Sequence, residues 1–260
     1  MNDKTTRTAS GSPRARVLVL ALAVALVGGL AMMREMMVRD EAGRPLAVYG
    51  PGGPYEPVRA CAEAFSREFG IPVTVVKGQP EAIAGRVAAD GDAYYGGAPY
   101  MMDDFIRAHP GVVDESSVRE LFSRRVGIIV RRGNPRGIRG VADLSRPGVS
   151  VLDVALENME ALRGDPPGGG AEVGRRVVSG EEGFAAWEGD PGIDAWVTYR
   201  SWFVRMTHGE EFLAIAAPDA LRATPVALTR RTRLRAEAMA FMDYLATDAA
   251  HRIFQEYGWE

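Results

Sequence analysis

The sequence is poor in the residues that cross-link a small fold. It has one cysteine and three histidines in 260 residues, which leaves no thiol pair for an internal disulfide and too few ligands for a structural zinc cage. Lysine is scarce as well, since Lys4 and Lys77 are the two lysines among 31 basic residues. Disulfide-stapled mini-proteins and zinc modules are therefore excluded. The 47% hydrophobic content is typical of a globular chain, and the length allows one large domain or two lobes held by an apolar core.

The side chains that an enzyme needs are also missing. The three histidines stand far apart, with no metal-ligand spacing between them, and no Gly-x-Ser-x-Gly turn offers a nucleophile. The adjacent acids Asp103 and Asp104 point to different sides of a helix, so they do not form a paired acid and base. We therefore expect no catalysis, no metal site and no cofactor.

One long apolar run stands near the start of the chain. Val17–Met33 contains no charge and follows four basic residues, which is typical of an export signal. Gly29-Leu30-Ala31 offers a small-x-small cleavage pattern, but Arg34 would equally suit an uncleaved anchor, and a buried core helix is a third alternative. We expect residues 1–44 to be a signal peptide or N-terminal membrane anchor, and the rest to be periplasmic or otherwise extracytoplasmic.

The exported part is acidic. Removing residues 1–31 takes away four basic residues and Asp3, which lowers the formal charge from −3 to −6. Nucleic-acid binding needs a basic surface, so we expect no nucleic-acid partner.

Short β-branched runs alternate with amphipathic segments from Pro45 onward, which is typical of an α/β protein with a largely parallel sheet. The predicted strands cover residues 46–49, 72–76, 93–95, 126–130, 149–154, 193–198 and 225–229, and the predicted helices cover 55–69, 81–89, 101–108, 180–187, 202–207, 235–246 and 248–257. The pattern restarts near residue 149, so the chain holds two sets of strands and helices. Open α/β sheets bind ligands beyond the carboxyl ends of their strands, so we expect a cleft between two lobes.

Glycine-rich loops follow two of the predicted strands. Gly50–Tyr55 leads straight into a helix, where glycines let a ligand approach the backbone and the first free amides attract an anion. A plain strand-to-helix turn is the alternative. Tyr94–Tyr100 forms a second such loop at the same predicted edge. In the later set, Arg200 follows a strand and is a natural cation for an oxyanion, although a solvated arginine at a helix start is equally compatible with the pattern.

Several segments resemble one protein family. They occur in the same order over residues 45–260, and they are Val48–Pro54, Met101–Phe105, Gly133–Ile138, Ala142–Leu144, Ile193–Trp196 and Ile253–Trp259. Together they resemble the type 2 periplasmic solute-binding proteins, and most of all the accessory colonization factor C branch, which is related to the molybdate- and sulfate-binding proteins.

The resemblance implies a two-lobed α/β protein with mixed sheets, which closes on a small anion and delivers it to an ABC permease in the inner membrane. Lobe 1 would combine 45–130 with 224–260, and lobe 2 would be 131–223. Ligands of this family are held by helix-start amides and hydroxyls. The residues expected to bind the ligand are Gly52, Gly53, Tyr55, Gly97, Ala98, Glu157, Asn158, Thr198, Tyr199 and Arg200.

The chain departs from the family pattern at three places. Gly96–Ala98 lacks the serines that the branch usually carries there, and Leu156–Met159 replaces its usual Gly-Gln-Thr-Gly loop and so brings in the carboxylate of Glu157. Arg200 stands where an asparagine is usual. The carboxylate and the guanidinium would pair with each other or grip a ligand that has both an amine and an acid, so an organic anion or a zwitterion is favoured over sulfate or molybdate.

A second hypothesis belongs to another class of protein. The missing hydroxyls and the possible uncleaved anchor would also suit a membrane-anchored sensor or adhesion module that kept the fold without transport. Such a module would contact the membrane through its N-terminal segment.

Overall fold

The computed structural model describes residues 43–163 and 173–260, and Pro45–Glu260 form one compact unit. The predicted export segment 17–33 lies outside the described residues. Within the described part of the chain, no helix is both long enough and apolar enough to cross a membrane.

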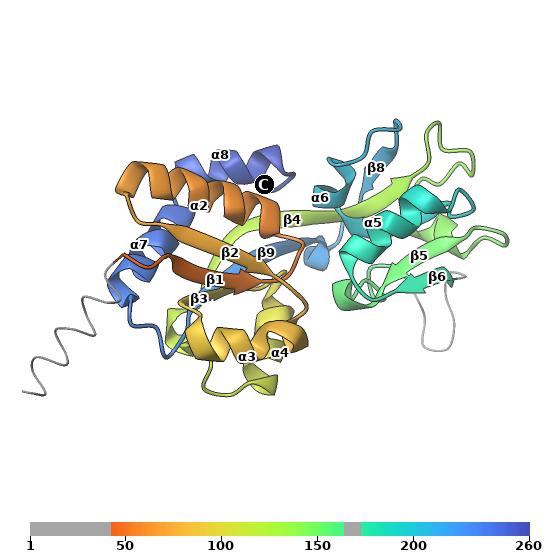
Figure 1. Ribbon diagram of the computed structural model, residues 1–260. Coiled ribbons are helices and arrows are strands. Elements are labelled where there is room, and N and C mark those ends of the chain that lie inside the picture. The colour runs from red at the N-terminus through yellow and green to blue at the C-terminus, as the bar shows by residue number, and fades with distance from the viewer. Residues whose placement is uncertain (1–42, 164–172) are drawn as a thin grey trace, which may run out of the picture. The chain divides into compact units, whose positions relative to one another are not determined.

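Strands and helices alternate along the chain (Figure 1). The strands are β1 (Leu46–Gly50), β2 (Val73–Lys77), β3 (Ala93–Tyr95), β4 (Arg119–Val130), β5 (Val151–Val154), β6 (Val173–Val177), β7 (Ala195–Tyr199), β8 (Glu211–Ala214) and β9 (Leu221–Leu228). The helices are α2 (Tyr55–Phe69), α3 (Pro80–Asp90), α4 (Pro99–Ala108), α5 (Gly180–Gly189), α6 (Arg200–Phe203), α7 (Arg235–Leu245) and α8 (Asp248–Glu256). Short 3-10 turns lie at Glu115–Ser117, Val141–Ser145, Ala155–Glu157 and Pro218–Ala220.

The strands form one mixed sheet in the order β2-β1-β3-β9-β4-β7-β5-β6, with β8 paired to β4. The pairs of β1 with β2 and β3, and of β5 with β6 and β7, are parallel, whereas β9 runs antiparallel to β3 and β4. The first part of β4 pairs with β9, and its last residues pair with β7 and β8, so this one strand runs through both halves of the sheet (Figure 1). The predicted α/β class is confirmed.

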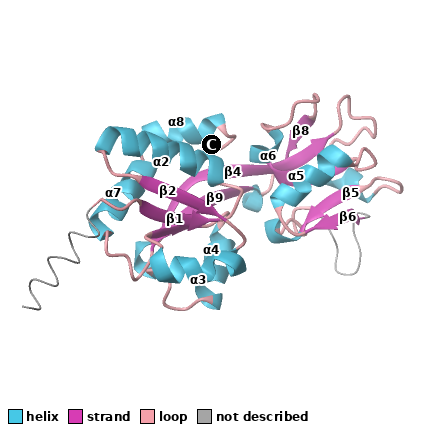
Figure 2. Ribbon diagram, in the orientation of Figure 1, coloured by secondary structure: helices cyan, strands magenta, loops and turns pink. Residues whose placement is uncertain are grey.

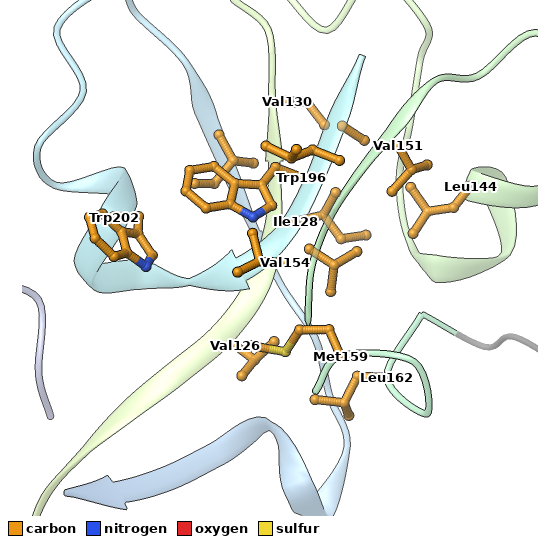
Figure 3. Close-up of a cluster of buried hydrophobic side chains, with 14 of the residues drawn as sticks. Val126, Ile128, Val130, Leu144, Val151, Val154, Met159, Leu162, Trp196 and Trp202 are labelled. Atoms are coloured by element: carbon orange, nitrogen blue, oxygen red, sulfur yellow. The ribbon is translucent and has the colours of Figure 1, made fainter. Parts of the chain in front are cut away.

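The apolar core is divided into clusters that follow the two halves of the sheet. In the first half, alternate residues of β1 face opposite ways: Val48 packs with α2, α7 and α8, while Tyr49 packs with α3 and α4. Helices therefore cover both faces of this half (Figure 2). The cluster of the second half gathers side chains of β4, β5 and β7 around Trp196 (Figure 3), and α5 adds Ala186 and Trp187 to it.

Several elements differ between the prediction and the structure. The strand predicted over 126–130 begins at Arg119, because its polar first part pairs with β9 across a register shift between Glu120 and Ser123. The helix predicted over 202–207 is wrong, since the helical turn covers Arg200–Phe203. Strands β6 and β8 were not predicted because they are short and largely exposed, so they carry no apolar alternation.

Two glycines provide a matched test of the packing around β4. A Cβ atom at Gly127 would lie 2.6 Å from the backbone oxygen of Leu213, whereas a Cβ at Gly85 on the exposed side of α3 would meet nothing within 4 Å. We expect Gly127→Ala to lower the free energy of unfolding by about 1–3 kcal/mol. Gly85→Ala should raise it by about 0.5–1 kcal/mol, because alanine favours the helix. Denaturant unfolding measures both, and equal effects would show that β4 and β8 are less tightly packed than described.

Candidate binding site

A cavity of about 330 Å³ lies where loops that follow the strands turn into helices. The residues that line it are Pro51, Gly52, Gly53, Pro54, Lys77, Gly78, Gln79, Pro80, Gly97, Met101, Arg124, Leu156, Glu157, Ser179, Gly180, Glu181, Glu182, Tyr199 and Trp202. They come from both halves of the sheet. The volume is within the range of small-molecule sites, about 300–1,000 Å³.

The starts of four helices meet at this cavity. Its walls include the residues just before or within the first turns of α2, α3, α4 and α5. The first amides of a helix have no partner inside the helix, and the helix dipole is positive at that end, so each start favours negative charge. The sheet brings the starts of α2, α3 and α4 together because β1, β2 and β3 are parallel and end at the same edge, and α5 follows β6 in the other half of the sheet. The cavity can therefore receive an anion.

Arg124 supplies a buried cation on the cavity wall. Its side chain is 2% exposed, and its guanidinium lies over the ring of Tyr199 at 3.7 Å and over that of Trp259 at 5.2 Å. Nη2 donates a hydrogen bond to the backbone oxygen of Gly97, while Nε has no hydrogen-bond partner among the described residues. Burial lowers the pKa of Arg124 because the charged form loses hydration.

No carboxylate in residues 43–163 or 173–260 forms an ion pair with Arg124. A buried cation without a paired anion is costly, and it marks a place where an external anion gains the most. Arg124 is thus the strongest electrostatic feature of the cavity.

Glu157 places a buried carboxylate on the same cavity. Its side chain is 6% exposed, Oε2 accepts a hydrogen bond from the hydroxyl of Thr198 at 2.6 Å, and Oε1 accepts one from Nε1 of Trp202 at 2.7 Å. Burial raises the pKa of Glu157 to about 7, although both hydrogen bonds and the cation of Arg124 act in the opposite direction.

Arg222 fixes the backbone that carries Glu157. Its Nη1 donates to the backbone oxygen of Glu157 at 2.7 Å, and its Nη2 donates to that of Asn158 at 3.1 Å. Asn158 itself adopts a left-handed conformation, with φ of 47°, which ends the short 3-10 turn before it. These contacts hold the carboxylate in place through the main chain.

At the rim of the cavity, the charged groups are paired or serve as caps. Lys77 forms an ion pair with Glu181, and both side chains are about half exposed. Ser179 caps α5 by accepting from the amide of Glu182, whose carboxylate in turn accepts from the amide of Val178 at 3.1 Å. These two hydrogen bonds fix the start of α5 at the cavity.

A profile described as bacterial extracellular solute-binding protein matches residues 46–260. The chain belongs to that family. The description places this solute-binding protein outside the cytoplasm, and the predicted resemblance to type 2 periplasmic solute-binding proteins is confirmed. The accessory colonization factor branch stays a prediction. No curated protein sequence matches the chain.

Solved structures with the same fold include several binding proteins. PEB3 of Campylobacter jejuni, bound to L-phospholactate, has a TM-score of 0.69 at 22% identity and covers 83% of this chain and 99% of its own. The sulfate-binding protein SubI of Mycobacterium tuberculosis has a TM-score of 0.67 at 19% identity, and the match covers 83% of this chain and 86% of SubI. The periplasmic molybdate-binding protein of Azotobacter vinelandii has a TM-score of 0.57 at 12% identity, with 83% and 98% covered. At these identities the likeness establishes the fold alone.

The cavity wall contains five of the predicted ligand residues. These are Gly52, Gly53, Gly97, Glu157 and Tyr199. Thr198 lies directly behind them, since it is fully buried and donates to Glu157. Tyr55 and Ala98 belong to the same two loops but are not part of the wall.

Arg200 and Asn158 lie apart from the wall. Both side chains are exposed and neither lines the cavity. Arg200 is the first residue of α6, and its charge acts on the C-terminal Glu260, whose pKa is lowered first by its hydrogen bond with Arg125 and to a smaller extent by Arg200. Two cations do line the cavity, Lys77 at its rim and the buried Arg124, and neither was predicted to bind the ligand.

A period of two along β4 places this arginine on the same face as two apolar residues, which is a partial signal. Arg124 stands two and four residues before Val126 and Ile128, so in an extended strand all three share one face. Val126 and Ile128 are buried, and a charged residue on the same face of the strand is unusual.

Proposed function

We propose that this solute-binding protein captures a small organic anion in the cavity for uptake by an ABC permease. The observation that carries the proposal is the buried, unpaired guanidinium of Arg124 on the cavity wall, surrounded by helix starts. Arginine binds carboxylates and phosphates through two parallel hydrogen bonds, and burial strengthens such contacts. The backbone amides of the helix starts complete the set of donors.

The wall favours an organic ligand over an inorganic one. Met101, Leu156 and Trp202 contribute apolar surface, and about 330 Å³ is far more than the roughly 30 Å³ that one water takes up in the liquid. A small inorganic ion would leave much of this surface uncovered. The L-phospholactate bound to PEB3 is likewise an organic rather than an inorganic ligand.

The two halves of the sheet are the lobes in this proposal. Lobe 1 combines 45–130 with 224–260, and lobe 2 is 131–223, with β4 and β9 as the crossover strands. The division of the core into clusters that follow these halves supports it. Ligand capture would then join the two lobes across the cavity, which gives a permease a surface that differs between the free and the loaded protein.

A melting screen of the exported protein tests the proposal. Carboxylates, sulfonates, phosphorylated acids and amino acids should be compared, because a ligand at a hundred times its Kd raises stability by about 2.7 kcal/mol. We expect compounds of at least one of these classes to raise the melting temperature by several degrees. If no compound does so, the sensor or adhesion hypothesis gains instead.

Gly53→Ala tests the role of the first glycine-rich loop. A Cβ at residue 53 would lie 2.9 Å from Nη1 of Arg124, so the guanidinium has to move. Because the displaced atom is the end of a long side chain, we expect a change of less than about 1 kcal/mol in the free energy of unfolding. Affinity for a compound found in the screen should fall about tenfold, which corresponds to about 1.4 kcal/mol of binding free energy. Titration calorimetry measures this affinity, and an unchanged affinity would show that Gly53 does not contribute to ligand binding.

A further inference from the structure

The cavity's second buried charge restricts which anions can enter. Glu157 already takes the hydroxyl of Thr198 and the indole N–H of Trp202, two donors that an incoming anion would otherwise use. Its carboxylate also lies against the start of α5, since a Cβ at Gly180 would be 2.8 Å from Oε1. The protein's own carboxylate therefore fills the anion position on this side of the cavity.

The charge balance of the wall leads to the same restriction. Its charged side chains are two cations, Lys77 and Arg124, and three carboxylates, Glu157, Glu181 and Glu182. Lys77 is paired with Glu181, and Glu182 caps α5. The two buried charges left to face a ligand are thus one cation and one anion, and within the described chain they form no ion pair with each other.

A ligand with one acidic group satisfies Arg124 but still faces Glu157. Each oxygen of Glu157 accepts one hydrogen bond in the structure, and a carboxylate oxygen has room for a second. An ammonium group is the complementary donor, because it adds a charge-assisted hydrogen bond and neutralises the carboxylate. A dianion brings a like charge instead, and like-charge contacts in a dry site are strongly unfavourable.

We infer that the ligand is a small zwitterion, with its acid group on Arg124 and its ammonium group toward Glu157, and that Glu157 determines this specificity. The inference rests on the proposed function. It distinguishes small amino acids from the hydroxy acids that have the same carbon skeleton, and from tetrahedral dianions such as sulfate.

Matched pairs of probes test the inference without any substitution. Serine and glycerate, aspartate and malate, and glutamate and 2-hydroxyglutarate differ in one ammonium or hydroxyl group, and sulfate serves as the dianion. Titration calorimetry at pH 7.5 should show at least one amino acid binding about 100-fold more tightly than its hydroxy-acid partner, and sulfate binding more weakly than either.

Glu157→Gln then identifies the residue responsible. An amide of the same shape can still accept from Trp202 and donate to the hydroxyl oxygen of Thr198. We expect the preference for the amino acid to fall from about 100-fold to less than about fivefold. Glu63→Gln is the control, because this exposed acid on α2 pairs with Arg59 and does not line the cavity, and it should keep the preference.

The outcomes separate the inference from the function on which it rests. The inference is overturned if a hydroxy acid or sulfate binds as tightly as every amino acid, or if its binding is accompanied by uptake of a proton. Either result leaves anion binding intact. A Glu157→Gln protein that keeps the preference overturns the role of Glu157. If no probe binds the wild-type protein, the proposed function fails and the inference fails with it.

Discussion

Replacing Arg124 by glutamine should reduce ligand affinity about 100-fold or more while the fold remains stable. Removing one partner of a buried, hydrogen-bonded charge pair costs about 2–5 kcal/mol of binding free energy. The folded state loses little, because an unpaired buried cation is itself costly, and its removal offsets the loss of the hydrogen bond to the backbone oxygen of Gly97. We therefore expect the melting temperature of the free protein to stay the same or to rise. Titration calorimetry and thermal unfolding measure the two effects.

Arg125→Gln is the matched control for this substitution. The two arginines are neighbours on β4, but Arg125 points to the other side, where it forms two hydrogen bonds with Glu260 at 2.6 and 2.7 Å. Surface ion pairs contribute about 0–1 kcal/mol, and this one does not touch the cavity, so affinity should be unchanged. If Arg124→Gln bound as tightly as Arg125→Gln, the anion would be held elsewhere.

Glu157→Gln should remove a pH dependence of stability that the wild-type protein shows between about pH 4.5 and 7. The pKa of Glu157 is raised by burial from 4.5 to about 7, so in this window the folded state holds a proton that the unfolded state has released. Stability therefore falls as pH rises through the window, and above it the ionised carboxylate costs the folded protein about 3 kcal/mol. The glutamine variant has no such proton, so its stability should be higher than that of the wild type by roughly this amount at pH 7.5.

Denaturant unfolding at pH 4.5, 6 and 7.5 measures this difference. An exposed acid supplies the control: Glu63 pairs with Arg59 on α2, and its side chain is 54% exposed. Glu63→Gln should alter the pH profile by less than about 0.5 kcal/mol. Parallel profiles for the wild type and Glu157→Gln would mean that the carboxylate is better hydrated than the structure shows.

The glycine-rich side of the site could be predicted from the sequence. Gly52, Gly53 and Gly97 follow short β-branched runs and precede helices, and this local pattern is enough to place them at the carboxyl edge of a parallel sheet. Glu157 was placed at the site by the family resemblance, because Leu156–Met159 aligns with the family's Gly-Gln-Thr-Gly loop. That loop usually carries no acid. In both cases, the order of elements along the chain determines the position.

The basic side of the site could not be predicted in the same way. Arg124 belongs to the part of β4 that has no apolar alternation of its own, and its burial depends on Tyr199 and Trp259, which lie far away in the sequence. Arg200 has the better local pattern, yet the first position of a helical turn does not fix where a long side chain points. Contacts between distant segments decide which of these two arginines is buried.

The hydrogen bonds of Glu157 show the same limit. The residue number follows from the aligned loop, whereas its two donors come from the end of β7 and from the short helix α6, more than 40 residues later. The aligned loop alone could not show that these donors were already occupied.

A crystal structure of the protein with the tightest ligand from the melting screen tests the central claim most directly. The account predicts density in the cavity between the starts of α2, α4 and α5, with an acidic group of the ligand about 3 Å from the guanidinium of Arg124. A ligand bound outside this cavity, or inside it with no acidic group in contact with Arg124, would contradict the account.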